Sequence, residues 1–169
     1  FTTSKGDRVI AKGTSQRLRG RSQLGLRYTK IILDDFESEL NTKTPDRRRE
    51  IKEWVMSTVE PALENSKGNE GSIWLIGTIV HYDSFLQSIY DGYVEAERDK
   101  RSYAWDVIYH KAIDTDGTVL WPSYFSKEKL LDIRRRFEDV GLAHKFAQEY
   151  LNEARDLENA KFKTDRTFI

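Results

Sequence analysis

The chain has 169 residues, of which 38% are hydrophobic, 12% aromatic and 33% charged, and this composition excludes a disordered chain. Its 28 Lys and Arg residues balance its 28 Asp and Glu residues, so any argument for nucleic-acid binding must rest on local clusters of charge. The absence of cysteine excludes disulfides and thiolate metal sites, and no apolar run reaches the length of a membrane span, so we expect an intracellular protein without a membrane partner.

The N-terminal part of the chain is predicted to be a β-hairpin followed by a loop. Residues 1–13 contain two short strand-like runs around a turn at residues 5–7. From Gly13 to about Gly25 the sequence is polar, arginine-rich and punctuated by glycine, which is typical of a loop. The apolar run at residues 30–33 then stops at Asp34 and Asp35. A short continuous apolar run of this kind predicts a strand buried on both faces, as in a parallel sheet.

The next elements alternate between helix and strand. Thr44 and Pro45 form a typical helix start, and the helical spacing of apolar residues continues until Pro61 ends or bends the helix. Residues 72–78 predict a second buried strand, and a second helix is expected from Ser84 to about Lys100. This order predicts an α/β fold with a mostly parallel sheet and flanking helices, in which the two strands are neighbours.

The last third of the chain changes character. A third strand is predicted at residues 103–113, followed by a turn at 114–117. Ser126 should cap a helix that Gly141 stops, and a further helix should follow. We therefore expect residues 1–119 to form a partial α/β core and residues 120–169 to form a small helical subdomain.

The acids that follow the first apolar strand are the best candidates for chemistry. Asp34, Asp35 and Glu37 lie where the carboxyl end of a parallel strand meets the ligand-binding edge of an open α/β sheet. In nucleotide hydrolases one such acid supports Mg²⁺ and a neighbouring carboxylate orients the attacking water. An acid pair after a strand is, however, more often a solvated turn, so this pattern alone is weak.

Two further features provide context for these acids. The stretch between Asp7 and Asp34 contains no acid but seven basic residues (Arg8, Lys12, Arg17, Arg19, Arg21, Arg27 and Lys30), which suits a loop that handles phosphate or one that is simply solvated. The second strand ends at Gly77 and Thr78, where a small residue and a hydroxyl could interact with a catalytic water. The three histidines are isolated from one another and indicate no metal site or catalytic triad.

Three blocks of the sequence, in order, resemble the large terminase subunit of tailed bacteriophages. Residues 18–21 and 27–37 are similar to the arginine-glycine turn and Walker B strand of that family. Residues 74–84 are similar to its coupling strand and the start of the helix that follows. Residues 121–131 and 146–152 resemble the closing helical segment that precedes its nuclease domain. The resemblance extends from about Lys12 to Ala154.

The resemblance implies a P-loop NTPase-like ATPase core that uses ATP and Mg²⁺ to drive double-stranded DNA into a procapsid. It implies that Asp34 supports Mg²⁺, that Asp35 or Glu37 polarises water, and that Gly77 and Thr78 form the coupling motif. It leaves open whether Arg19 and Arg21 act on ATP or on DNA. The expected partners are DNA, the portal protein, the small terminase subunit and further copies in a ring, in the bacterial cytoplasm on the procapsid.

One element of that family is missing from these residues. The sequence Gly-x-x-x-x-Gly-Lys-Ser/Thr of the P-loop does not occur, so a complete ATPase site cannot be built from this chain alone. We interpret the abrupt ends at Phe1 and Ile169 as those of a segment excised from a longer protein. The alternative, from another functional class, is a non-catalytic assembly module whose basic loop contacts DNA or a partner protein.

Overall fold

The computed structural model describes residues 1–4, 6–13, 27–66 and 68–154. Two parallel strands and four α-helices make up most of the regular structure in these ranges, so the fold is mixed α/β, as predicted. No helix in the described ranges is long and apolar enough to cross a membrane. The expected hairpin is present but short: Thr2 and Arg8 form an antiparallel bridge, and Phe1 and Val9 exchange two backbone hydrogen bonds of 3.0 Å.

The centre of the fold is a parallel pair of strands, β1 (Lys30–Asp34) and β4 (Ser72–Ile76). The register joins Lys30 to Ser72 and Asp34 to Ile76, so both strands end at the same edge. This confirms the predicted adjacency of the two strands. A separate short hairpin, β2 (Asn65–Ser66) and β3 (Asn69–Glu70), lies just before β4.

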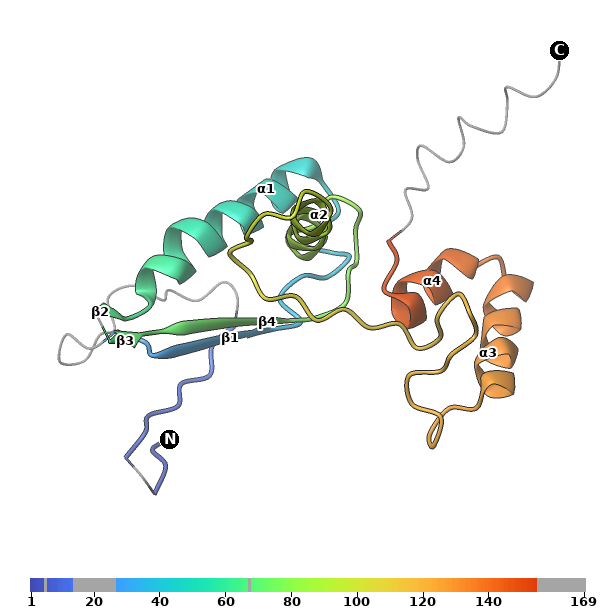
Figure 1. The fold of residues 1–169 in the computed structure, drawn as a ribbon, viewed down its shortest axis with the longest axis horizontal. Coiled ribbons are helices and arrows are strands. Elements are labelled where there is room, and N and C mark those ends of the chain that lie inside the picture. Colours follow the sequence, from blue (N-terminus) through green and yellow to red (C-terminus); the bar gives the residue numbers. More distant parts are fainter. Residues whose placement is uncertain (5, 14–26, 67, 155–169) are drawn as a thin grey trace, which may run out of the picture.

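Two helices cover one face of the strand pair (Figure 1). They are α1 (Pro45–Trp54), which continues as a π-turn (Val55–Val59) and a 3-10 turn (Glu60–Ala62), and α2 (Phe85–Arg98). Thr44 and Ser84 cap them by accepting hydrogen bonds from Arg47 and Gln87, as the polar residue before each apolar pattern suggests. The buried core beneath these helices consists of Ile31, Leu33, Phe36, Val55, Val59, Leu63 and Phe85.

The other face of the strand pair is open in the described part of the chain. Ile32, Trp74 and Ile76 are each about half exposed, whereas Ile31 and Leu33 are buried. The prediction that β1 is buried on both faces is therefore wrong for these residues. A run of consecutive apolar residues cannot by itself show whether one or two layers of helices cover a sheet.

The predicted third strand is absent, since residues 103–113 form no strand. The alternation that suggested it is real, because residues 103, 105, 107 and 109 are half-buried and their neighbours are exposed. The aromatic side chains of Trp105 and Tyr109 pack on α2 rather than within a sheet. Tyr109 stacks on Tyr90 of α2 with ring centroids 4.3 Å apart, and Trp105 meets Phe85 edge to face.

The last described elements are α3 (Lys127–Asp139) and α4 (Ala143–Leu151), which pack against each other. Ser126 caps α3, and Gly141 follows it with φ of +74°, as expected for a helix stop. An aromatic cluster of Phe125, Phe137, Phe146 and Tyr150 fills the space between the helices. The two helices expected here are therefore present, and residues 155–169 of the predicted helical subdomain lie outside the described residues.

Candidate functional site

The carboxyl ends of β1 and β4 bring the acidic and glycine-threonine segments together. Asp34 pairs with Ile76 in the register, and the backbone N–H of Asp35 donates to the carbonyl of Ile76 at 3.0 Å. Gly77 and Thr78 follow directly. The predicted placement of Asp34 and Thr78 at one edge of the sheet is therefore confirmed.

Asp35 occupies an unusual position at this edge. Its φ is +45°, in the left-handed region that non-glycine residues seldom adopt, and its side chain is exposed. A Cβ placed on Gly77 would lie 3.5 Å from Asp35 Oδ1 and 3.2 Å from Leu86 Cδ1. The contact with Asp35 would be an ordinary one, whereas the contact with Leu86 would be tight, so glycine at position 77 mainly leaves room for the start of α2 beside the Asp35 carboxylate. Backbone strain of this kind tends to occur at functional sites.

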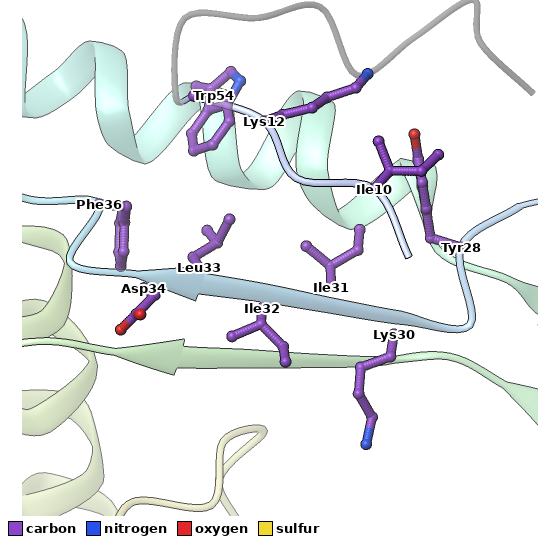
Figure 2. A pocket seen from close by; sticks show the side chains of 11 residues that line it. Ile10, Lys12, Tyr28, Lys30, Ile31, Ile32, Leu33, Asp34, Phe36 and Trp54 are labelled. Carbon is purple, nitrogen blue, oxygen red and sulfur yellow. The ribbon is translucent and has the colours of Figure 1, made fainter. Parts of the chain in front are cut away.

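Asp34 points to the opposite side of β1 from the core. Figure 2 shows its carboxylate on the same side as Ile32 and Lys30, away from Ile31 and Leu33. Figure 2 draws the side chains around a cavity of about 150 Å³, which is lined by apolar residues that include Phe36 and Trp54 and by charged residues that include Lys30 and Asp34. Asp34 thus borders this cavity, while its carboxylate points to the side of β1 away from Phe36 and Trp54.

Glu37 has a different environment, because its carboxylate caps the N-terminus of α2. The backbone N–H groups of Phe85 and Leu86 donate to its two oxygens at 2.7 and 2.9 Å, and the side chain is buried. Burial raises the pKa of Glu37, and the hydrogen bonds from Leu86, Phe85 and Ser84 oppose that rise. Both oxygens of this carboxylate are thus engaged at the helix end.

A charged network beside Glu37 was not anticipated from the sequence. The buried guanidinium of Arg48 donates to Asp83 Oδ2 at 2.8 Å and to the carbonyl of Thr42 at 2.9 Å. Lys52 donates to the other oxygen of Asp83 at 2.7 Å. These hydrogen bonds, first from Lys52 and then from Arg48, lower the pKa of Asp83. The spacing of Arg48 and Lys52, four residues apart on α1, is the one sequence signal that could have indicated this shared partner.

The structure describes only part of the basic stretch between Asp7 and Asp34. Arg19 and Arg21 lie outside the described residues, so their assignment stays a prediction. Arg27 donates to the carbonyls of Pro61 and Leu63, which ties it to the end of the helix that follows β1. The ammonium of Lys30 lies 5.0 Å from the ring centroid of Trp74. The interactions shown for these two residues are therefore with the protein itself.

The edge of the sheet offers only a few carboxylates to a metal ion. No group of three or more His, Asp or Glu side chains that could hold a metal ion occurs within the described ranges. Mg²⁺ bound with a nucleotide needs only one or two carboxylates, because water and phosphate oxygens supply the rest of its octahedral shell. Asp34 and Asp35, two exposed acids in succession at the end of β1, could supply that number of carboxylates.

Comparison with known proteins gives no additional support for a function. No protein-family model, curated protein or solved structure matches the chain. The geometry of the edge formed by β1 and β4 therefore carries the functional argument.

Proposed function

We propose that this chain is part of the ATPase domain of a phage large terminase subunit, with a P-loop NTPase-like core that hydrolyses ATP to drive double-stranded DNA into a procapsid. The observation that carries the proposal is the parallel pairing that places Asp34 and Asp35 beside Gly77 and Thr78. Open α/β sheets bind their ligands at this edge. The P-loop would come from outside these residues.

Each residue of the edge has a role in this proposal. Asp34 would hold Mg²⁺, which when bound with ATP neutralises charge on the phosphates. Asp35 would orient the attacking water, because its carboxylate is exposed at the edge whereas that of Glu37 is engaged by α2. Glu37 would then fix the position of α2, and Gly77 and Thr78 would sense the state of the site.

The wider assembly follows from the same resemblance. The partners would be DNA, the portal protein, the small terminase subunit and further copies of the chain in a ring, in the host cytoplasm on the procapsid. Arg19 and Arg21 would contribute positive charge to the transferred phosphate or to the DNA backbone.

The test uses the intact protein that contains a P-loop. Asp34→Ala and Asp35→Ala should each lower the ATPase rate by at least about 100-fold, while Glu50→Gln, an exposed change on α1, should leave it unchanged. The 169-residue chain alone should show no appreciable hydrolysis. Full activity in Asp34→Ala would contradict the proposal. DNA binding without any ATPase in the intact protein would favour the non-catalytic assembly module.

A further inference from the structure

The end of α4 contacts the segment that leaves β4. Asn152 ends α4 in a left-handed conformation, with φ of 56° and ψ of 33°. Its side-chain oxygen Oδ1 accepts a hydrogen bond of 2.8 Å from the backbone N–H of Ile79. Ile79 follows Thr78 directly and is only 4% exposed, so this N–H has little access to water as an alternative partner.

The same helix also contacts the segment that leaves β1. Glu39 forms an ion pair with Lys145, and Gln148 Nε2 donates to Glu39 Oε1 at 3.1 Å. Gln148 is buried although its side chain is polar. The helix α4 and its capping residue therefore contact both the segment that follows Asp34 and Asp35 and the segment that follows Gly77. In the sequence, α4 lies more than sixty residues after these segments.

The C-terminal end of α4 is itself held firmly. The hydroxyl of Tyr109 lies 3.1 Å from the carbonyl of Leu151 and 2.8 Å from that of Asn152, and the Tyr109 ring stacks on Tyr90 of α2. The backbone N–H of Ala112 donates to the carbonyl of Tyr150 at 2.7 Å. Asn152 is thus held in place by contacts with α2 through Tyr109 as well as by α4. It can therefore hold the backbone of Ile79 in a defined position.

We propose that Asn152 is a positioning residue that sets the backbone conformation of residues 77–79 from outside the α/β core. Its amide oxygen fixes the peptide of Ile79, and Gly77, two residues earlier, lies against the Asp35 carboxylate. A displacement of Asn152 would therefore change the space beside Asp35. The effect on ATP hydrolysis rests on the proposed function, whereas the positioning of Ile79 does not.

Because the backbone of Asn152 is left-handed, substitutions at this position can remove the hydrogen bond to Ile79 without disturbing the end of α4. Glycine adopts this conformation without strain but has no side-chain acceptor. Aspartate tolerates the conformation and keeps an acceptor oxygen of nearly the same shape. Asn152→Gly therefore removes the contact with Ile79 while preserving the end of α4, and Asn152→Asp preserves both.

The decisive measurement is amide hydrogen exchange at Ile79 by NMR on the 169-residue chain. In Asn152→Gly the exchange of this amide should accelerate by about five-fold or more, the effect of losing one hydrogen bond. Asn152→Asp should retain wild-type exchange. Glu138→Gln, which breaks an exposed ion pair with Arg134 on α3, should also leave it unchanged. Asn152→Ala provides a second variant without the amide if the glycine variant does not fold.

Two results would overturn the positioning role. One is unchanged exchange at Ile79 in the variants that lack the amide. The other is equal acceleration in Asn152→Asp, which would show general loosening of the helical unit. In the intact protein, Asn152→Gly should lower kcat for ATP with little change in KM, and Asn152→Asp should restore it. Accelerated exchange with unchanged kcat would refute the effect on the reaction, and absence of ATPase in the wild-type protein would refute the proposed function while leaving the positioning intact.

Discussion

Replacing Glu37 with alanine should destabilise the protein by about 2–4 kcal/mol, because it removes the acceptor for two backbone N–H groups at the start of α2. The N–H of Phe85 would be left in a buried place, and a buried donor without a partner costs about 1–3 kcal/mol. Leu86 is half-buried, so water can partly replace its partner. Loss of negative charge at the helix N-terminus adds about 0.3–1 kcal/mol. Burial raises the pKa of Glu37, so the charged form is disfavoured in the folded protein, and this limits the total loss of stability.

Urea unfolding followed by circular dichroism and tryptophan fluorescence measures this effect. Glu50→Ala is the matched control, because Glu50 is an exposed residue of α1, and it should change the unfolding free energy by less than about 0.5 kcal/mol. If Glu37→Ala is no more costly than Glu50→Ala, then Glu37 does not cap α2 and the argument that favours Asp35 as the water-orienting acid loses its basis.

The pH dependence provides an independent check on the same residue. The pKa of Glu37 is raised above its ordinary value of 4.5, so the folded protein holds this proton more tightly than the unfolded chain does. The resulting contribution to stability is complete below pH 4.5 and is lost as the pH rises through the raised pKa. Glu37→Gln should remove this decline. A decline of the same size in the variant would show that another group causes it.

Two other changes test the neighbouring residues. Asp35→Gly should raise the unfolding free energy by up to about 1 kcal/mol, because glycine relieves the left-handed backbone. Asp34→Gly, in the strand, should lower the unfolding free energy by about 0.5–1 kcal/mol. Equal effects of the two changes in urea unfolding would contradict the conformation assigned to Asp35. Asp83→Asn should cost about 1–2 kcal/mol at neutral pH, a modest value because Asp83 is 43% exposed. Since the pKa of Asp83 is lowered, its stabilising effect is present above pH 3.8 and is lost as the pH falls through the lowered pKa, so the difference from wild type should shrink in acid.

Local signals in the sequence predicted the fold wherever the structure depends on local chemistry. Thr44 and Ser126 each cap a helix as expected, because a short polar side chain before an apolar pattern satisfies a free N–H of the first turn, and Ser84, the expected start of a helix, caps it in the same way. The adjacency of β1 and β4 also followed from element order, because a strand, a helix and a second strand form a parallel pair.

Long-range contacts could not be predicted in the same way. The alternation at residues 103–113 has the period of a strand, but period alone does not show whether a sheet or a helix provides the surface that buries every second residue. Asn152 and Ile79 are similarly separated by 73 positions, and neither has a neighbour in sequence that suggests the contact. Such contacts depend on how the elements pack, which the sequence pattern does not specify.

The different environments of Asp35 and Glu37 follow from a single backbone conformation. Residues two apart in a continuing strand point to the same side, so an extended chain would have presented both carboxylates together. The left-handed φ of Asp35 ends the strand, because it departs from the extended conformation at that residue. The chain then turns, and Glu37 reaches the N-terminus of α2 while the carboxylate of Asp35 stays beside Gly77. The sequence Asp-Asp-x-Glu could not distinguish the two acids. Their different environments depend on the left-handed φ of Asp35, a backbone conformation that a residue other than glycine seldom adopts and that the residue types alone do not predict.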